Sequence, residues 1–288
     1  MVCSCLGSTQ GFIRCIAGRH LLRFDPVGVL FAAVFAILAT GSETPAIEIQ
    51  VSIESRSSSG SVALSPFSIA VHNGTFDAFD MMMAAMNGVE QIAELGDGTN
   101  FFSAAGAADA SAVTGVLTAT SNAFGPGIFL PGGGGSLTLD LDPSVNRYLS
   151  FGAMVVPSND AFIGNDSPMG IELFDSQGNF VAQTVTIMGS DIWDAGTEVN
   201  QLLGAAYIVG QTATDGMDEN GHVMAVDLAS QFAPYLSTES PSGSMFTVVP
   251  DAAMPLATIS FQVVPEPASS VLACTALFGL GLLRKHRR

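Results

Sequence analysis

Alternating apolar and polar residues in the middle of the chain predict β-strands. Residues 47–54 (IEIQVSIE) alternate with a period of two, as expected for a strand with one buried face. Residues 136–142 alternate again, after a Pro-Gly-Gly-Gly-Gly segment at 131–135 that we expect to be a flexible turn. Residues 148–156 are almost continuously apolar, which predicts a central, buried strand.

Shorter segments extend this pattern. Residues 171–174 and 180–188 flank the turn sequence DSQGN and predict a hairpin. Further strands are expected at 67–71, 246–249 and 257–264. Helical spacing occurs at 79–95, whereas the small residues at 104–112 indicate a loop. Many short strands with Gly- and Asn-rich turns favour an all-β fold, an antiparallel β-sandwich with one or two short helices.

Both ends of the chain have the composition of targeting signals. Residues 27–38 (VGVLFAAVFAIL) follow three arginines and precede Ala-Thr-Gly, which predicts a signal peptide over residues 1–41. The segment 264–288 contains Pro265-Glu266-Pro267, an apolar stretch and a basic end, which predicts a short membrane helix with its basic end in the cytoplasm. A retained anchor is the alternative at each end. Residues 42–263 are the predicted domain between them.

Charge and cysteine content narrow the possible functions. The chain carries 26 acidic and 9 basic residues, a net charge of −17. This charge disfavours nucleic-acid binding, because phosphates would be repelled at most of the surface. Between residues 43 and 264 there are 24 acids and two arginines, a net charge of −22. All four cysteines lie in the predicted targeting segments, so we expect neither disulfides nor thiolate chemistry in the domain.

The predicted domain contains none of the common catalytic motifs. Its histidines, His72 and His222, lie far apart and fit no metalloprotease spacing. There is no Gly-x-Ser-x-Gly elbow and no P-loop. We expect His72, which follows an apolar strand, to be a hydrogen-bonded residue at the strand end. The sequence therefore favours a protein without enzymatic activity, and a secreted polysaccharide hydrolase is the alternative.

Two acidic loops are the candidate functional site. Residues 155–167 follow the central strand, and residues 191–200 contain the only tryptophan. Carboxylates, amide oxygens and backbone carbonyls are the ligands that calcium prefers, and Gly164 and Gly196 allow the backbone to bend toward an ion. The composition indicates a hard-cation site, with solvated acidic turns as the alternative. Residues 215–221 form another acidic turn, without the spacing of an EF-hand.

Both loops carry a resemblance to a known family. VPSND at 156–160, followed by WDAGTE at 193–198, resembles the spondin N-terminal domain of F-spondin and mindin, especially its bacterial versions. The resemblance implies a C2-like antiparallel β-sandwich that holds a divalent cation, usually calcium, in loops at one end. By position, the resemblance assigns Asp160, Asp194 and Glu198 as metal ligands. Glu198 stands where animal members more often have aspartate.

The C-terminal segment resembles the PEP-CTERM sorting signal of bacteria that produce exopolysaccharide. This resemblance implies that an exosortase-type membrane protease recognises Pro265-Glu266-Pro267 after transient anchoring in the inner membrane, and delivers the protein to the cell surface or outside. Together the resemblances imply a non-catalytic adhesion or extracellular-matrix module, with an extracellular polysaccharide or a surface protein as partner. A structural coat protein is a further possibility.

Overall fold

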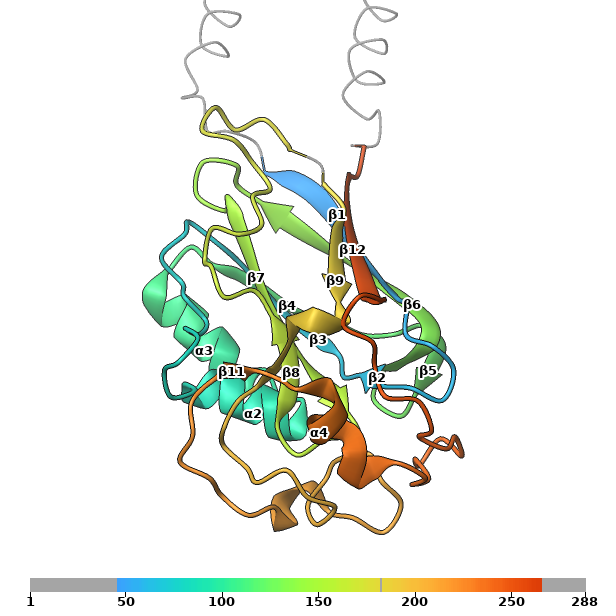
Figure 1. The fold of residues 1–288 in the computed structure, drawn as a ribbon. Coiled ribbons are helices and arrows are strands. Elements are labelled where there is room, and N and C mark those ends of the chain that lie inside the picture. The colour runs from blue at the N-terminus through green and yellow to red at the C-terminus, as the bar shows by residue number, and fades with distance from the viewer. Residues whose placement is uncertain (1–45, 182, 266–288) are drawn as a thin grey trace, which may run out of the picture. The chain divides into compact units, whose positions relative to one another are not determined.

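The computed structural model describes residues 46–181 and 183–265, which form mostly antiparallel β-structure with a few short helices (Figure 1). The predicted signal peptide lies outside these residues, as does the predicted sorting segment after Pro265. Among the described helices, none is both long and apolar enough to cross a membrane.

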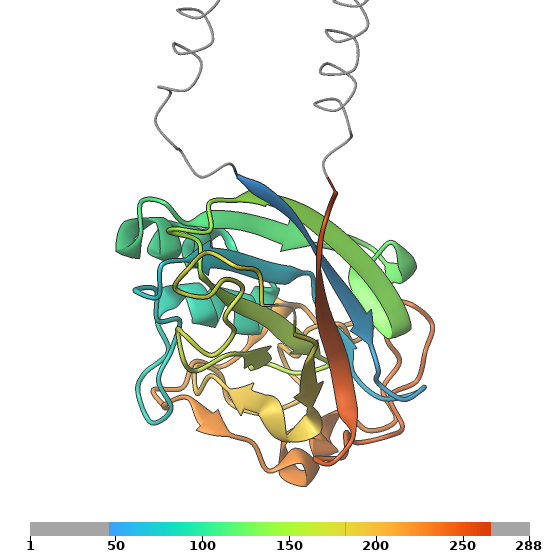
Figure 2. The ribbon, with the colours of Figure 1, turned by 90° about the horizontal axis from the view of Figure 1, so that it is seen from above.

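The described strands form a curled antiparallel sheet. They are β1 (Ile47–Ser55), β2 (Ala63–Leu64), β3 (Phe67–His72), β4 (Val113–Leu117), β5 (Ser121–Phe124), β6 (Ile128–Leu141), β7 (Tyr148–Val156), β8 (Ala161–Gly164), β9 (Val185–Met188), β10 (Ile192–Asp194), β11 (Met224–Ala225) and β12 (Pro255–Val263). The main order is β11-β10-β8-β7-β2-β6-β1-β12-β9, and β3, β4 and β5 pair beside this path. The short β2 pairs with both β6 and β7. It therefore joins the half of the sheet that contains β6, β1, β12 and β9 to the half that contains β7, β8, β10 and β11. In Figure 2, β1 and β12 run side by side, with β6 on the other side of β1.

The hydrophobic core confirms the strongest sequence predictions. In β1, Ile49, Val51 and Ile53 are buried, and the side chains between them are more exposed. Strand β7 is buried at every position after Tyr148, so it is the predicted central strand. Burial of each large apolar side chain contributes about 1.5–3 kcal/mol, and the curled sheet places the apolar faces of both halves in one core.

Three α-helices are present in the described part, where one or two were expected: α2 (Asn87–Leu95), α3 (Thr99–Ala108) and α4 (Leu228–Phe232). Three one-turn 3-10 helices accompany them, η1 (Gly189–Asp191), η2 (Ala213–Asp215) and η3 (Ala233–Tyr235). The helix predicted at 79–95 begins only at Asn87, and the loop predicted at 104–112 partly belongs to α3. Helix α3 is stabilised by packing, because Gly88 of α2 lets the backbone of Phe101 approach closely.

Three predictions about strands and turns are wrong in whole or in part. The glycine-rich segment 131–135 is not a turn between strands, because it lies within β6, where the pairing with β5 shifts register. The predicted hairpin is reduced to a single bridge between Phe174 and Phe180, and β9 pairs with β12 instead. Residues 246–249 form no strand, because the N–H groups of Thr247 and Val248 both donate to the carbonyl of Gly60.

His72 is a hydrogen-bonded residue at the end of β3, as predicted. Its Nδ1 accepts from the N–H of Gly74 at 3.0 Å, so Nε2 carries the proton and donates to Ser150 Oγ at 2.9 Å. Burial lowers the pKa of His72, and the charge of Asp109 only partly opposes this shift. The neutral, fully satisfied ring is a structural element of the β3–β7 pair.

Candidate metal centre

The two predicted acidic loops meet where β8 pairs with β10. The antiparallel register places Asp194, the last residue of β10, opposite Ala161, the first residue of β8. Asp160 immediately precedes Ala161 and therefore lies beside Asp194. Strand β8 is found toward the lower part of the sheet in Figure 1. Asp160 is completely buried, and Asp194 is partly buried.

Asp160 holds the second loop through its backbone. Its Oδ2 accepts hydrogen bonds from the N–H groups of Thr197 at 2.8 Å and Glu198 at 3.0 Å. Its Oδ1 is buried and has no hydrogen-bond partner among the described residues. A buried acceptor without a partner costs roughly 1–3 kcal/mol. A cation bound at this oxygen would remove that cost.

Asp194 is fixed by its own loop. Its Oδ1 accepts from the N–H of Gly196 at 2.7 Å, and its Oδ2 accepts from Asn200 Nδ2 at 3.0 Å. Gly196 has a left-handed backbone with φ of 67°, and a Cβ there would meet the backbone nitrogen of His222 at 2.6 Å. This close approach confirms that Gly196 is where the loop bends.

A polar network beside the carboxylates was not found from the sequence. Asn200 exchanges two amide hydrogen bonds with Gln231, at 2.7 and 2.6 Å. The hydroxyl of Tyr235 donates to Asn159 Oδ1 at 2.7 Å. Gln231 and Tyr235 come much later in the chain than the second loop, on α4 and η3. No local pattern indicates this pairing, because it depends on how the chain returns to the site.

In the described part of the chain, the buried carboxylates have no lysine or arginine beside them. Burial, and then the charge of Asp194, raises the pKa of Asp160 to about 7. Burial also raises the pKa of Asp194. Both arginines of the described part form ion pairs elsewhere, Arg56 with Glu54 and Arg147 with Glu172. A proton or a bound cation must therefore neutralise the Asp160–Asp194 pair, and two carboxylates fit a hard cation.

The side chain of Glu198 has different neighbours. It is buried, and its Oε2 accepts a long hydrogen bond of 3.4 Å from Asn159 Nδ2. A Cβ at Gly216 would overlap its carboxylate, so the acidic turn around Gly216 covers it. Burial, and then the charge of Glu94, raises the pKa of Glu198 to about 7. Asp218 also contributes to this shift.

The structure thus brings together the carboxylates of Asp160 and Asp194 and the backbone of Glu198. Within residues 46–181 and 183–265, no group of three or more His, Cys, Asp or Glu side chains is arranged to hold a metal ion. Trp193 packs edge-on against Phe79, with ring centroids 5.5 Å apart, so it belongs to the apolar packing beside the site.

The family model described as Spondin_N matches residues 59–231, which is more than half of the chain. The chain therefore belongs to the Spondin_N family. The match includes both acidic loops and ends within α4. It supports an extracellular spondin-like module. No curated protein matches the chain.

Proposed function

We propose that the protein is an exported, calcium-binding module of cell-surface adhesion or the extracellular matrix. The observation that supports this proposal most directly is the Asp160–Asp194 pair. Asp160 Oδ1 is buried without a hydrogen-bond partner, and among the described residues no lysine or arginine neutralises the pair. The two halves of the curled sheet and the loops at one end fit the C2-like sandwich expected for this family. The proposed role is non-catalytic, because the sequence of the domain contains none of the common catalytic motifs.

Asp160 and Asp194 would hold the ion. Calcium would supply positive charge and up to eight coordination positions for oxygen. Asp160 keeps the backbone of Thr197 and Glu198 in place, and Asp194 keeps Gly196 and Asn200 in place. The conformation of the loop at residues 191–200 and the binding of the ion therefore depend on the same two carboxylates.

A cavity beside the site gives access to it. The cavity has a volume of about 530 Å³, and its lining includes Asp194, Asn200 and Glu219. This space allows a partner's acidic group or a sugar hydroxyl to approach the ion. The site therefore suits a cation that bridges to a partner as well as one that only orders the loops.

Calcium titration of the full chain, after removal of metal with a chelator, tests the proposal. We expect about one ion per chain, at least a hundredfold weaker binding in Asp160→Ala and Asp194→Ala, and normal binding in Asp140→Ala. Asp140 is an exposed residue of β6, so its variant controls for the loss of one charge. At calcium concentrations a hundred times the dissociation constant, binding should raise the free energy of unfolding by about 2.7 kcal/mol.

Two results of this titration would count against the proposal. One is no binding by the wild-type chain up to millimolar calcium. The other is equal binding in all three aspartate variants, which would place the ion elsewhere. The Glu198→Gln variant tests whether Glu198 is the third ligand. A large loss of calcium affinity would mean that the Glu198 carboxylate turns toward the ion.

We also propose that residues 1–41 are removed as a signal peptide and that residues 264–288 are a PEP-CTERM sorting signal. The composition of the two ends supports this proposal. Mass spectrometry of the exported protein should then show a chain that begins near residue 42 and ends near Pro265. The Glu266→Ala variant should keep its C-terminal segment. An exported chain with both ends intact would refute processing.

A further inference from the structure

A second cavity adjoins the start of the first acidic loop, at Val156 and Pro157. Its volume is about 560 Å³, which is within the range of roughly 300–1,000 Å³ typical of ligand pockets. Its walls come from the β1–β2 loop, β2, β6, the end of β7, the loop around Tyr207 and residues 238–247. Neither Asp160 nor Asp194 lines it.

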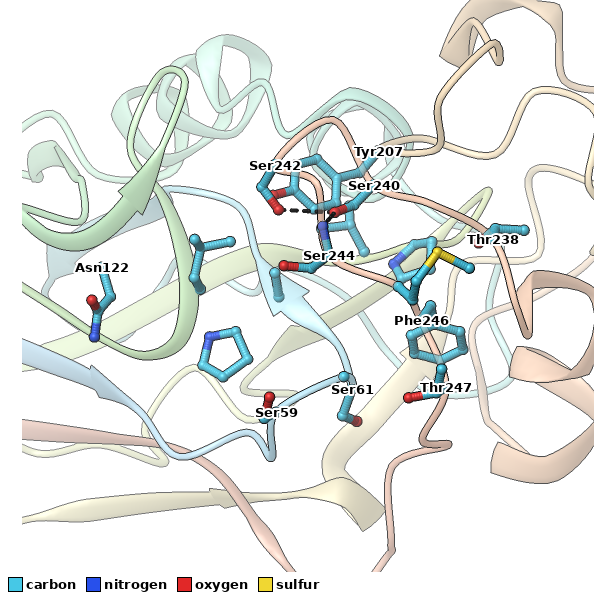
Figure 3. A pocket seen from close by; sticks show the side chains of 17 residues that line it. Ser59, Ser61, Asn122, Tyr207, Thr238, Ser240, Ser242, Ser244, Phe246 and Thr247 are labelled. Atoms are coloured by element: carbon cyan, nitrogen blue, oxygen red, sulfur yellow. Dashed lines mark hydrogen bonds between the residues drawn. The ribbon is translucent and has the colours of Figure 1, made fainter.

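The described residues that line this cavity are rich in hydroxyl groups and include no charged side chain. Ser240, Ser242 and Ser244 lie on one side of the cavity, and Ser59 and Ser61 lie on the opposite side (Figure 3). Each hydroxyl can both donate and accept a hydrogen bond. Without lysine or arginine, the lining offers no counter-charge to a phosphate or carboxylate ligand. A neutral ligand with many hydroxyl groups matches this surface.

Apolar surfaces alternate with the hydroxyl groups. The rings of Tyr207 and Phe246 line the cavity together with Leu130 and Pro131. Sugar rings have apolar C–H faces and polar edges, so an aromatic ring beside hydroxyl groups can contact both parts. The combination of aromatic faces, hydroxyl groups and no charge favours a saccharide over a purely apolar ligand.

The backbone of Tyr207, which lines the cavity, has a conformation that costs free energy. Its φ is 65°, in the left-handed region that a bulky side chain rarely adopts. Its hydroxyl is buried and has no hydrogen-bond partner in the described part of the protein. Such backbone strain costs of order 1–3 kcal/mol and often occurs at ligand sites. The edge-on contact with Phe124, at 5.7 Å between ring centroids, fixes the ring in place.

Backbone hydrogen bonds hold the wall that residues 238–247 contribute. The N–H groups of Thr247 and Val248 donate to the carbonyl of Gly60, at 2.7 and 2.9 Å. The N–H of Phe246 donates to the carbonyl of Thr238 at 2.9 Å. Residues 238–247 lie beyond residue 231, where the Spondin_N match ends. This wall therefore belongs to the part of the chain that the family model does not cover.

We propose that this cavity binds a neutral saccharide, with Ser240, Ser242 and Ser244 contacting its hydroxyl groups and Tyr207 and Phe246 contacting its ring faces. Among the described residues, the lining has no carboxylate pair of the kind that glycosidases use, so the cavity binds sugar without hydrolysing it. This site is separate from the cation site, and the inference stands whether or not calcium binds.

Calorimetric titration of the full-length protein tests this inference, in a buffer without sugar-based detergents. The neutral probes are maltose, cellobiose, lactose and the polysaccharide dextran, and sodium glucuronate is the anionic control. We expect saturable binding of at least one neutral probe below about 10 mM and no binding of glucuronate. Binding of dextran alone would support recognition within a sugar chain, and binding of a disaccharide would support recognition of a short or terminal unit.

Three variants locate the binding. Ser242→Ala should weaken it about fivefold to tenfold, the effect of one lost neutral hydrogen bond. Ser244→Trp, at an exposed position on the cavity wall, should fill the space and abolish it. Ser176→Ala, in an exposed turn elsewhere, should bind like the wild type. Thermal unfolding of each variant shows that the fold is intact.

Several outcomes would overturn the inference. They are no binding of any neutral probe, glucuronate binding as tightly as a neutral sugar, or unchanged binding in Ser244→Trp. Asp160→Asn separates this inference from the proposed calcium site, because it keeps the acceptor for the N–H groups of Thr197 and Glu198, and its loss of calcium binding should leave saccharide binding unchanged.

Discussion

Asp160→Asn is expected to stabilise the calcium-free protein by about 2 kcal/mol at pH 7, whereas Asp160→Ala is expected to destabilise it by a similar amount. The asparagine oxygen can still accept from the N–H groups of Thr197 and Glu198, and the substitution removes a buried charge. The new amide group faces the carboxylate of Asp194, which can accept its hydrogen bond. Alanine removes the acceptor as well, which leaves two backbone donors unpaired at roughly 1–3 kcal/mol each.

The pH dependence of stability follows from the raised pKa of Asp160. The pKa of Asp160 is about 7 in the folded protein and 3.8 for an unperturbed aspartate, so the folded state binds the proton more tightly than the unfolded state. The stability that this proton contributes is fully present below about pH 4 and is lost as the pH rises to about 7. Calcium favours the ionised carboxylate, so the stabilisation by calcium should increase over the same interval.

Denaturant unfolding at several pH values, with calcium and with chelator, measures both effects. The Asp160→Asn variant should lose the dependence on calcium and the part of the fall in stability that Asp160 contributes between about pH 4 and 7. Glu198, whose pKa is also raised to about 7, should keep its own part of the fall. A variant that calcium still stabilises as much as the wild type would contradict the assignment of Asp160. If Asp160→Asn and Asp160→Ala were equally unstable without calcium, the buried charge would not be the dominant cost.

The parts of the fold that the sequence predicts are those with local signals. The alternation in β1 and the apolar run of β7 follow directly from which side chains are buried. The bend at Gly196 and the pairing of Asp160 with Asp194 lie in the motifs that indicate the family. Each of these signals is a short run of consecutive residues.

The missed features depend on contacts between distant segments. The side chain of Glu198 is covered by a turn at Gly216, and Tyr235 reaches Asn159 from a segment much later in the chain. Helix α3 contains the alanines that suggested a loop, and it is stabilised by packing against α2. No periodicity in the sequence indicates these contacts. The glycine-rich segment 131–135 was predicted wrongly for the same reason. Its place in β6 depends on the neighbouring strands and loops that pack against it.

Gly135→Ala is expected to destabilise the protein by about 2 kcal/mol or more, whereas Gly134→Ala should be nearly neutral. Gly135 pairs with Ile53 of β1, and a Cβ there would overlap the carbonyl oxygen of Thr118. Because that oxygen belongs to the backbone, the chain itself must move, and overpacking of this kind typically costs about 1–3 kcal/mol or more. At Gly134 the nearest atoms, Ser121 Oγ and the carbonyl oxygen of Ile53, are 3.4 and 3.5 Å from the added Cβ.

Chemical denaturation of the two variants compares neighbouring residues of one strand. Alanine restricts the unfolded chain equally at both positions, which favours the folded state by about 0.4–1 kcal/mol. A difference between the variants therefore reports on contact with the backbone of Thr118 and Ala119. If both variants were equally stable, the glycines would be needed only for flexibility, as a turn would require. A loss confined to Gly135→Ala would show that the absence of a side chain lets a neighbouring backbone pack directly on β6.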